Sequence, residues 1–253
     1  MKALFDQDLL DFSFGTDDLH YMVVMRFYQR QMEALYDMPS IPPRPMGVGS
    51  PTYHHSMRVA QDVYEFARFV GLSENIARNL KFAAELHDIG KLDVPLEIHE
   101  KPGRFTPEEF AEIKKHTDYG AARIENSGIS HPLLDLAEQV AYYHHERPDG
   151  KGYHGLSGAD MPMHLRLMQI CDIYDAISAE RPYRSKEEQL SPAQTLAMMT
   201  DPQSPIYAQI DQDIMKKFAL LKANTITAVP SGEAFDTILA QIDDVESYQE
   251  IVG

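Results

Sequence analysis

Residues 76–91 are IARNLKFAAELHDIGK, and this stretch decides the fold. Its apolar residues recur at helical spacing, which predicts an amphipathic helix over the whole stretch. Near its end, His87 and Asp88 place two metal-ligand side chains side by side. Adjacent helical residues point about 100° apart, so both face one site only if that site lies across the helix surface, as a metal centre does. Lys91 returns to the same face, and we expect Gly90 to end the helix and let the backbone approach a bound group.

A lone His-Asp pair is also an ordinary structural pair. The rest of the chain is needed to distinguish a metal site from such a pair. Each interval between successive candidate sites is about one helical hairpin long. A bundle whose alternate helices point the same way would bring all five sites to one level. The sequence therefore predicts an all-α fold around one metal centre. The sites follow at intervals of 32, 29, 28 and 28 residues: His55, His87 with Asp88, His116, His144 with His145, and Asp172.

The composition is that of a soluble globular protein. The chain has 253 residues, of which 43% are hydrophobic and 25% charged, and this length can bury a large core. No apolar run approaches the length of a membrane span, and the acidic start of the chain lacks the positive charge of a signal peptide. A single cysteine, Cys171, excludes an internal disulfide and fits a reducing compartment. We therefore expect a cytoplasmic protein in which Cys171 is a buried apolar side chain.

The formal net charge of −16 narrows the possible partners. Nucleic-acid polymers and anionic membranes both require basic surface, so neither is expected. An anionic substrate would have to be attracted locally, by bound divalent cations or by a few basic side chains in the cleft.

Two parts are expected along the chain. Residues 1–50 hold a helix from about Leu19 to Tyr36, capped by Asp17 or Asp18, and then a linker rich in proline and glycine. Residues 51–253 form the main domain. Its further helices are expected at Thr52–Val70, Val94–Glu100, from Thr106-Pro107 with a continuation or restart towards Ile124, Leu133–His145, from Pro162, Ser191–Thr200, Ile206–Lys222 and Glu233–Tyr248.

The helix from Pro162 is apolar nearly all round, which predicts a central, buried position. Asp172 and Asp175 lie on one face of it. Burial of two carboxylates in an apolar helix is costly unless cations or hydrogen bonds compensate, and a metal ion accounts for that placement. On the helix at Thr52–Val70, His55 shares the apolar face, whereas His54 points elsewhere.

A glycine-rich loop, Asp149–Gly155, follows the two adjacent histidines. Its glycines allow backbone amides to approach an anion, and we expect Lys151 and Tyr153 to contact the substrate. The alternative is a flexible surface loop. Arg181 and Arg184 follow the helix that carries the carboxylates, and they either bind phosphate or base or pair with surface acids.

The predicted ligands are imidazoles and carboxylates without a set of thiolates, which suits iron, manganese, zinc or nickel better than magnesium. Six ligands and one bridge suffice for two ions and leave positions open for water and substrate, as in catalytic sites. We expect Asp88 to bridge two ions that are held by two trios: His55, His87 and Asp172, and His116, His144 and His145.

The chain contains neither a Gly-x-Ser-x-Gly elbow nor a P-loop, so hydrolysis by a metal-held hydroxide is favoured over a covalent nucleophile. The expected catalytic residues are Asp88, Lys91 and Asp175. Lys91 would bind substrate by neutralising a phosphate oxygen as charge builds up. Asp175 would either orient or deprotonate the water, or hydrogen-bond a ligand histidine.

The order of six motifs resembles the HD-GYP branch of the HD phosphohydrolase superfamily, from about Thr52 to Asp213. The resemblance implies an HD-type helical bundle that hydrolyses cyclic dinucleotides, chiefly cyclic di-GMP, to the linear dinucleotide or GMP. It also implies two or three metal ions, often iron or manganese, at the matching His, Asp and Lys positions, and arginines that help to hold substrate. The motifs are His55-x-x-Arg58-Val59, His87-Asp88-Ile89-Gly90-Lys91, Lys115-His116, His144-His145-Glu146-Arg147-x-Asp149-Gly150-x-Gly152-Tyr153, Asp172-x-x-Asp175-Ala176 and Arg181-Pro182-Tyr183-Arg184.

Two positions depart from the family pattern. Pro51 stands where members with three metals have a glutamate, so two metals are expected. His154 stands where the family has the proline of Gly-Tyr-Pro, in a loop one residue shorter, and it is either a new ligand or proton donor or, as we favour, a solvent-facing histidine.

The leading hypothesis is a phosphodiesterase with two divalent ions that acts on a cyclic dinucleotide, first of all cyclic di-GMP. One alternative keeps the metals and changes the substrate to another nucleotide or phosphoester. The other is a module that binds a cyclic dinucleotide in a signalling complex without turnover. A homodimer or a signalling protein is a possible partner, through residues 1–50.

Overall fold

The computed structural model describes residues 10–13, 18–179 and 190–225. Helices are the only regular elements in this part of the chain, so the all-α prediction is confirmed. In chain order they are α1 (Leu19–Asp37), α2 (Pro51–Phe69), α3 (Glu74–Glu85), the 3-10 helix η2 (Ile89–Asp93), α4 (Leu96–His99), α5 (Pro107–Lys114), α6 (His116–Glu125), α7 (Pro132–Tyr143), α8 (Met163–Ser178), α9 (Pro192–Thr200), the 3-10 helix η3 (Tyr207–Gln209) and α10 (Gln212–Thr225).

Several helix starts follow from local side-chain chemistry. Asp18 caps α1 by accepting from the amide of His20, and Ser50 caps α2 by accepting from that of Tyr53. Thr106 and Glu109 form a reciprocal capping box at the start of α5. These caps satisfy amides that the first helical turn leaves unpaired.

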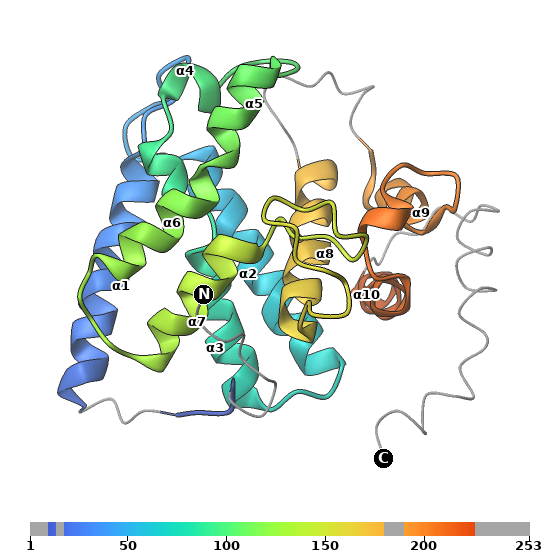
Figure 1. The fold of residues 1–253 in the computed structure, drawn as a ribbon, viewed down its shortest axis with the longest axis horizontal. Helices are drawn as coiled ribbons and strands as arrows, with labels where there is room; N and C mark the ends of the chain where they lie inside the picture. Colours follow the sequence, from blue (N-terminus) through green and yellow to red (C-terminus); the bar gives the residue numbers. More distant parts are fainter. Residues whose placement is uncertain (1–9, 14–17, 180–189, 226–253) are drawn as a thin grey trace.

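The bundle is centred on α8. Its side chains Leu165, Leu167 and Ile170 are completely buried, as is Cys171, which confirms the predicted central position and the apolar role of the cysteine. Helix α2 packs against α3 and α8, while α6 packs against α7 and η2. Helix α1 flanks this core on one side, and α9 and α10 lie on the other (Figure 1).

The His-Asp stretch ends its helix earlier than expected. Helix α3 stops at Glu85, and the chain continues through a turn into η2, so the predicted helix over residues 76–91 was wrong at its end. The cause is a contact with α6. A Cβ on Gly90 would lie 1.9 Å from the carbonyl oxygen of His116 and 2.4 Å from the amide nitrogen of Gly120. Gly90 therefore brings the backbone close to α6, and its approach to a bound group stays a prediction.

Other boundaries shift by a few residues. The expected helix at Val94–Glu100 is reduced to α4, α7 ends at Tyr143, and α6 begins anew at His116. The Ile206–Lys222 prediction corresponds to η3 followed by α10. The predicted helix Glu233–Tyr248 lies outside the described residues.

The division of the chain near residue 50 stays a prediction. Buried side chains of α1, including Val24 and Leu35, belong to the same apolar core as Val59 of α2. None of the helices described combines the length and the apolar character that a bilayer crossing requires.

Candidate metal centre

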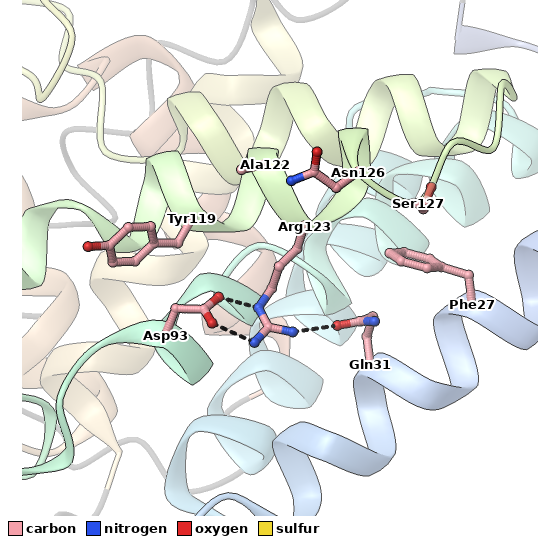
Figure 2. Close-up of a pocket in the computed structure, with 8 residues that line it drawn as sticks. All are labelled: Phe27, Gln31, Asp93, Tyr119, Ala122, Arg123, Asn126 and Ser127. Atoms are coloured by element: carbon pink, nitrogen blue, oxygen red, sulfur yellow. Dashed lines mark hydrogen bonds and ion pairs between the residues drawn. The ribbon is translucent and has the colours of Figure 1, made fainter.

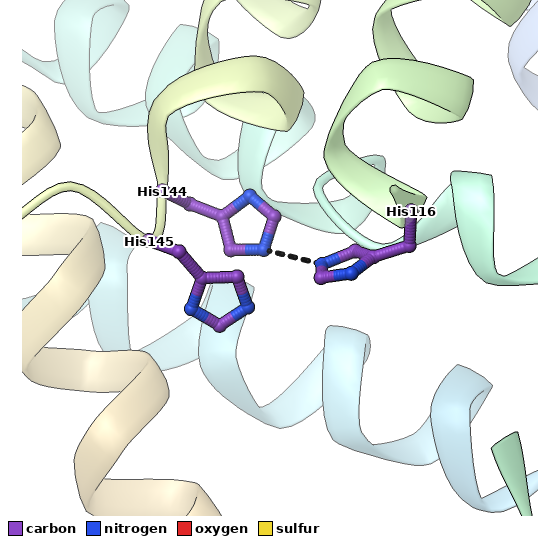
Figure 3. Close-up of side chains that lie close together, drawn as sticks. All are labelled: His116, His144 and His145. Carbon is purple, nitrogen blue, oxygen red and sulfur yellow. Dashed lines mark hydrogen bonds between the residues drawn. The ribbon is translucent and has the colours of Figure 1, made fainter. Parts of the chain in front are cut away.

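The structure brings all seven predicted ligands together at one level of the bundle. They come from α2, the turn before η2, the start of α6, the end of α7 and the middle of α8. Within each of three groups the possible ligand atoms lie within 4.8 Å of one another. Figure 3 shows the rings of one group converging. The groups are His55, His87 and Asp172; His116, His144 and His145; and His87, Asp88 and His144.

Asp88 lies between the two predicted trios and presents one oxygen to each. Its Oδ2 is 3.4 Å from His87 Nε2 and 3.7 Å from His55 Nε2. Its Oδ1 is 3.4 Å from His116 Nε2 and 3.8 Å from His144 Nε2. This is the placement that a bridging carboxylate requires.

Three rings are held by the backbone of the helix that ends just before each of them. Nδ1 lies 2.7 Å from the Ala84 carbonyl in His87, 2.7 Å from that of Ile113 in His116, and 3.0 Å from that of Ala141 in His144. Since a carbonyl oxygen only accepts, each Nδ1 carries the proton and each Nε2 presents a lone pair to the centre.

The resulting arrangement of lone pairs fits a cation. His116 Nε2 and His144 Nε2 face each other at 3.2 Å (Figure 3), although both are acceptors in this tautomer. Among the described residues, His87 Nε2 and Asp88 Oδ1 are buried without a hydrogen-bond partner. Buried acceptors without donors are costly, and a divalent ion bound to them removes that cost. The residues therefore fit a metal ion.

His55 is held from outside the centre. Its Nδ1 lies 2.6 Å from Asp175 Oδ2, and Arg58 donates to both oxygens of Asp175, at 2.6 and 3.0 Å. Its Nε2 is 3.0 Å from Asp172 Oδ1. Of the two roles expected for Asp175, the geometry favours the hydrogen bond to a ligand histidine. Arg58 was not predicted to take part, although its position three residues after His55 places both on one face.

The electrostatics keep His116, His145 and the two carboxylates in the form that binds a metal ion. Burial lowers the pKa of His116 to about 3 and that of His145 to about 4, so both rings are neutral at neutral pH. Burial alone would raise the pKa of Asp88, but Lys91 and the neighbouring imidazoles lower it far below its usual range. Asp172 is also ionised, because His55 outweighs its burial and lowers its pKa. His55 differs from these rings: burial alone would lower its pKa, but the hydrogen bonds to Asp172 and Asp175 raise it, so His55 has to release a proton when a metal binds.

Of the residues predicted to contact substrate, Lys91 and Tyr153 lie beside the centre, whereas Lys151 is exposed. Lys91 Nζ donates to Asp88 Oδ2 at the edge of the centre. The ring centroid of Tyr153 is 4.5 Å from that of His145, and Lys114 Nζ lies 5.1 Å from the Tyr153 centroid. Lys151 is exposed, and its role stays a prediction. Sequence reasoning missed Lys114, because the family motif drew attention to its neighbour Lys115, which is exposed and pairs with Glu112.

Predictions for Arg181 and Arg184 lie outside the described residues. His54 is exposed, as expected.

The glycine-rich loop differs from expectation. The amides of His154 and Leu156 donate to the buried carboxylate of Glu146, and that of Lys151 donates to Asp149, so these three do not approach a bound anion. His154 is partly buried and stacks on Tyr142 with a centroid distance of 3.8 Å. It is therefore neither a ligand of the centre nor a solvent-facing side chain. The sequence signals for Glu146 were its place next to two histidines and its presence in the family motif.

A separate surface pocket lies between α1, η2 and α6 (Figure 2). No predicted site residue lines it. Its Arg123 donates to both oxygens of Asp93, and Nη1 lies 3.4 Å from Gln31 Oε1. The guanidinium is thus already engaged within the protein.

Residues 49–207 match the family model described as the HD domain. The chain belongs to the HD-domain family. This HD domain is 39% identical over 135 residues to a cyclic di-GMP phosphodiesterase of Thermotoga maritima, covering 53% of the chain and 36% of that relative. It is 31% identical over 182 residues to the cyclic di-GMP phosphodiesterase PA4108 of Pseudomonas aeruginosa, covering 72% and 42%. A 3'3'-cGAMP-specific phosphodiesterase 2 of Vibrio cholerae is 38% identical over 131 residues, covering 51% and 25%.

The HD domain therefore spans less than half the length of each of these relatives. Among solved structures, Bd1817 of Bdellovibrio bacteriovorus, described as an HDG"Y"P protein, matches with a TM-score of 0.57 and 17% identity, over 85% of this chain and 76% of that one. The HD domain of the L. monocytogenes phosphodiesterase PgpH, in complex with cyclic-di-AMP, has a TM-score of 0.50 and 17% identity, over 78% and 95%. The HD-type fold and the resemblance to HD-GYP proteins are confirmed.

Proposed function

We propose that this HD domain is a metal-dependent phosphodiesterase that opens a cyclic dinucleotide, with cyclic di-GMP as the first candidate substrate. The observation that carries the proposal is the pair of trios on either side of Asp88, one of two histidines and an aspartate and one of three histidines. Relatives named as cyclic di-GMP and cGAMP phosphodiesterases support the substrate class.

Two divalent ions are proposed for the centre, one in each trio, with iron or manganese as the metals and zinc or nickel as alternatives. The donor set of five imidazoles and two carboxylates suits such metals. When bound, they supply Lewis acidity to the phosphoryl group and to the attacking water. Asp88 would hold both ions, since one of its oxygens faces each trio.

The protein's own groups would then orient the substrate and balance its charge. Lys91 is 20% exposed and lies beside Asp88, so its ammonium can reach a phosphate oxygen and stabilise the charge that develops on it. Arg58 and Asp175 hold the ring of His55 in place. Burial, with Asp172 and Asp88, raises the pKa of Tyr153 to about 12, so Tyr153 offers a neutral aromatic wall for a base.

The test is a substrate panel on protein purified without oxygen and loaded with manganese or iron. Cyclic di-GMP, 3'3'-cGAMP, cyclic di-AMP and bis-p-nitrophenyl phosphate are each incubated with the protein, and products are separated by chromatography. We expect the linear dinucleotide or the mononucleotide from at least one cyclic dinucleotide. Tight binding of a cyclic dinucleotide without product, with both metals, would instead support the non-catalytic module, and cleavage of the simple ester alone would support another phosphoester.

A further inference from the structure

The loop over the centre is anchored on one buried carboxylate. Glu146 directly follows the ligand pair and is completely buried. Its Oε1 accepts from the amide of His154 at 2.6 Å, and its Oε2 accepts from that of Leu156 at 2.5 Å. From α8, Gln169 Nε2 donates to the Glu146 carbonyl at 2.7 Å. Gln169 therefore holds the main chain of Glu146, and the side chain of Glu146 holds the loop.

The loop passes directly over this residue. A Cβ on Gly152 would lie 2.5 Å from the Glu146 Cα and 2.8 Å from Oε2. Such contacts require glycine. The backbone on both sides of Tyr153 is thus fixed, by the close approach of Gly152 before it and by the hydrogen bond of His154 after it.

His154 makes contacts that the proline of the family pattern would not make. Proline has no amide hydrogen, so the bond from residue 154 to Glu146 exists because the residue is not proline. The His154 ring also stacks on Tyr142, with an interplanar angle of 15°, and its Nε2 is 3.1 Å from Thr117 Oγ1. The shorter loop of this chain is held by these contacts.

The anchored loop determines the surroundings of His145. In the part of the chain that the structure describes, the His145 ring has no hydrogen-bond partner. Its neighbours are the rings of His144, Tyr153 and His116, at centroid distances of 4.2, 4.5 and 5.0 Å. Ligand histidines are usually oriented by a partner outside the metal site, and Tyr153 occupies that place for His145.

We propose that Glu146 and His154 are positioning residues, which hold Tyr153 against His145 and so orient this ligand. The consequence for metal binding rests on the proposed function, whereas the placement of Tyr153 does not. The two parts can therefore be tested separately.

The placement is tested by fluorescence. The sequence contains no tryptophan, so Tyr153→Trp places the only tryptophan on the loop, where it can be excited at wavelengths that tyrosine does not absorb. Its quenching by acrylamide is measured alone and combined with Glu146→Gln, His154→Pro or His154→Ala. We expect stronger quenching with Glu146→Gln and His154→Pro, which each remove a hydrogen bond between the carboxylate and the loop. The matched control His154→Ala keeps the amide hydrogen and should increase quenching less than His154→Pro.

The orientation of His145 is tested by manganese titration of Glu146→Gln and His154→Pro with Tyr153 in place, which also decides the matter if Tyr153→Trp does not fold. We expect the affinity of one bound ion to fall about 10-fold, the lower end of what partners of ligand histidines contribute. A lower melting temperature with unchanged affinity and quenching would overturn the proposal, because the two residues would then serve stability only. Reduced affinity in the variants of a protein that cleaves no cyclic dinucleotide would overturn the proposed function and leave the positioning role intact.

Discussion

The two walls of the candidate centre are built differently. His87, His116 and His144 are oriented by carbonyls three residues earlier, so the helix that ends just before each ring also fixes it. His145, one residue beyond His144, lies against Tyr153 of a loop that is held through Glu146. A helical wall is thus specified locally, whereas the loop wall depends on residues that come later in the chain. Changes in the loop should alter the orientation of His145 and leave the fold intact.

The largest effect on the rate of turnover is expected from a substitution of Asp88, which lies between the two trios. Asp88→Asn removes the charge that both trios share, and metal ions contribute several kcal/mol of transition-state stabilisation. At about 1.36 kcal/mol per tenfold, turnover of the cleaved dinucleotide should fall by about 10³-fold or more. The measurement is the initial rate, with metal content determined on the same sample.

The matched control is Asp93→Asn, the same change at the exposed end of η2, where the carboxylate pairs with Arg123 (Figure 2). Surface ion pairs contribute about 0–1 kcal/mol, so this variant should keep both metal and rate. Equal rates for the two variants would contradict the central role of Asp88.

The helical wall should be sensitive to the packing of η2 on α6. Gly90→Ala forces a Cβ into the backbone of His116 and Gly120, and overpacking of this kind costs about 1–3 kcal/mol or more. At roughly 2–4 °C per kcal/mol for a chain of this size, the melting temperature should fall by up to about 12 °C. Gly128→Ala is the comparison. The φ of Gly128 is +67°, which strains a residue with a Cβ, but no atom lies within 4 Å of the added Cβ. A smaller effect at Gly90 than at Gly128 would show that this contact is not tight.

The third prediction concerns His55, the ligand ring on α2 that is held by a carboxylate and not by a backbone carbonyl. Asp175→Asn weakens the charged link between Arg58 and His55. We expect the affinity of one ion to fall about 10- to 100-fold, as for other partners of ligand histidines, in a titration with manganese. Asp213→Asn, at an exposed residue of α10, should leave the affinity unchanged. Unchanged affinity in Asp175→Asn would exclude an orienting role.

The smallest expected effect is the dependence of the free energy of unfolding on pH through His164. His164 of α8 lies 2.6 Å from Gln139 Oε1 of α7, and burial lowers its pKa to about 4. Below pH 6.5 His164 binds a proton in the unfolded chain but not in the folded protein. The free energy of unfolding therefore decreases as the pH falls towards 4. The loss from this group between pH 7 and pH 5 is at most about 2 kcal/mol. Urea unfolding at both pH values should show a smaller loss in His164→Gln, and equal losses would contradict the assignment.

The helical wall could be predicted largely from the sequence. Helical periodicity is local, and the regular spacing of His55, His87, His116 and Asp172 fixes how far the chain travels between the turns that carry them. The structure offers both predicted trios, together with a third group of His87, Asp88 and His144.

The loop wall and the end of α3 could not be predicted, because their causes are contacts between distant residues. Helix α3 stops at Glu85 since η2 must approach α6, which begins only at His116. The role of Glu146 depends on amides eight and ten residues later, and no periodicity marks them. Lys114 is not part of the family motif, which contains its neighbour Lys115, and its contact with Tyr153 exists only in the folded chain.

The most direct test is anomalous diffraction from crystals loaded with manganese or iron. The account predicts two peaks, one within His55, His87 and Asp172 and one within His116, His144 and His145, with an oxygen of Asp88 about 2 Å from each. A loaded crystal with no peak between these residues, or with ions bound only elsewhere on the surface, would contradict it.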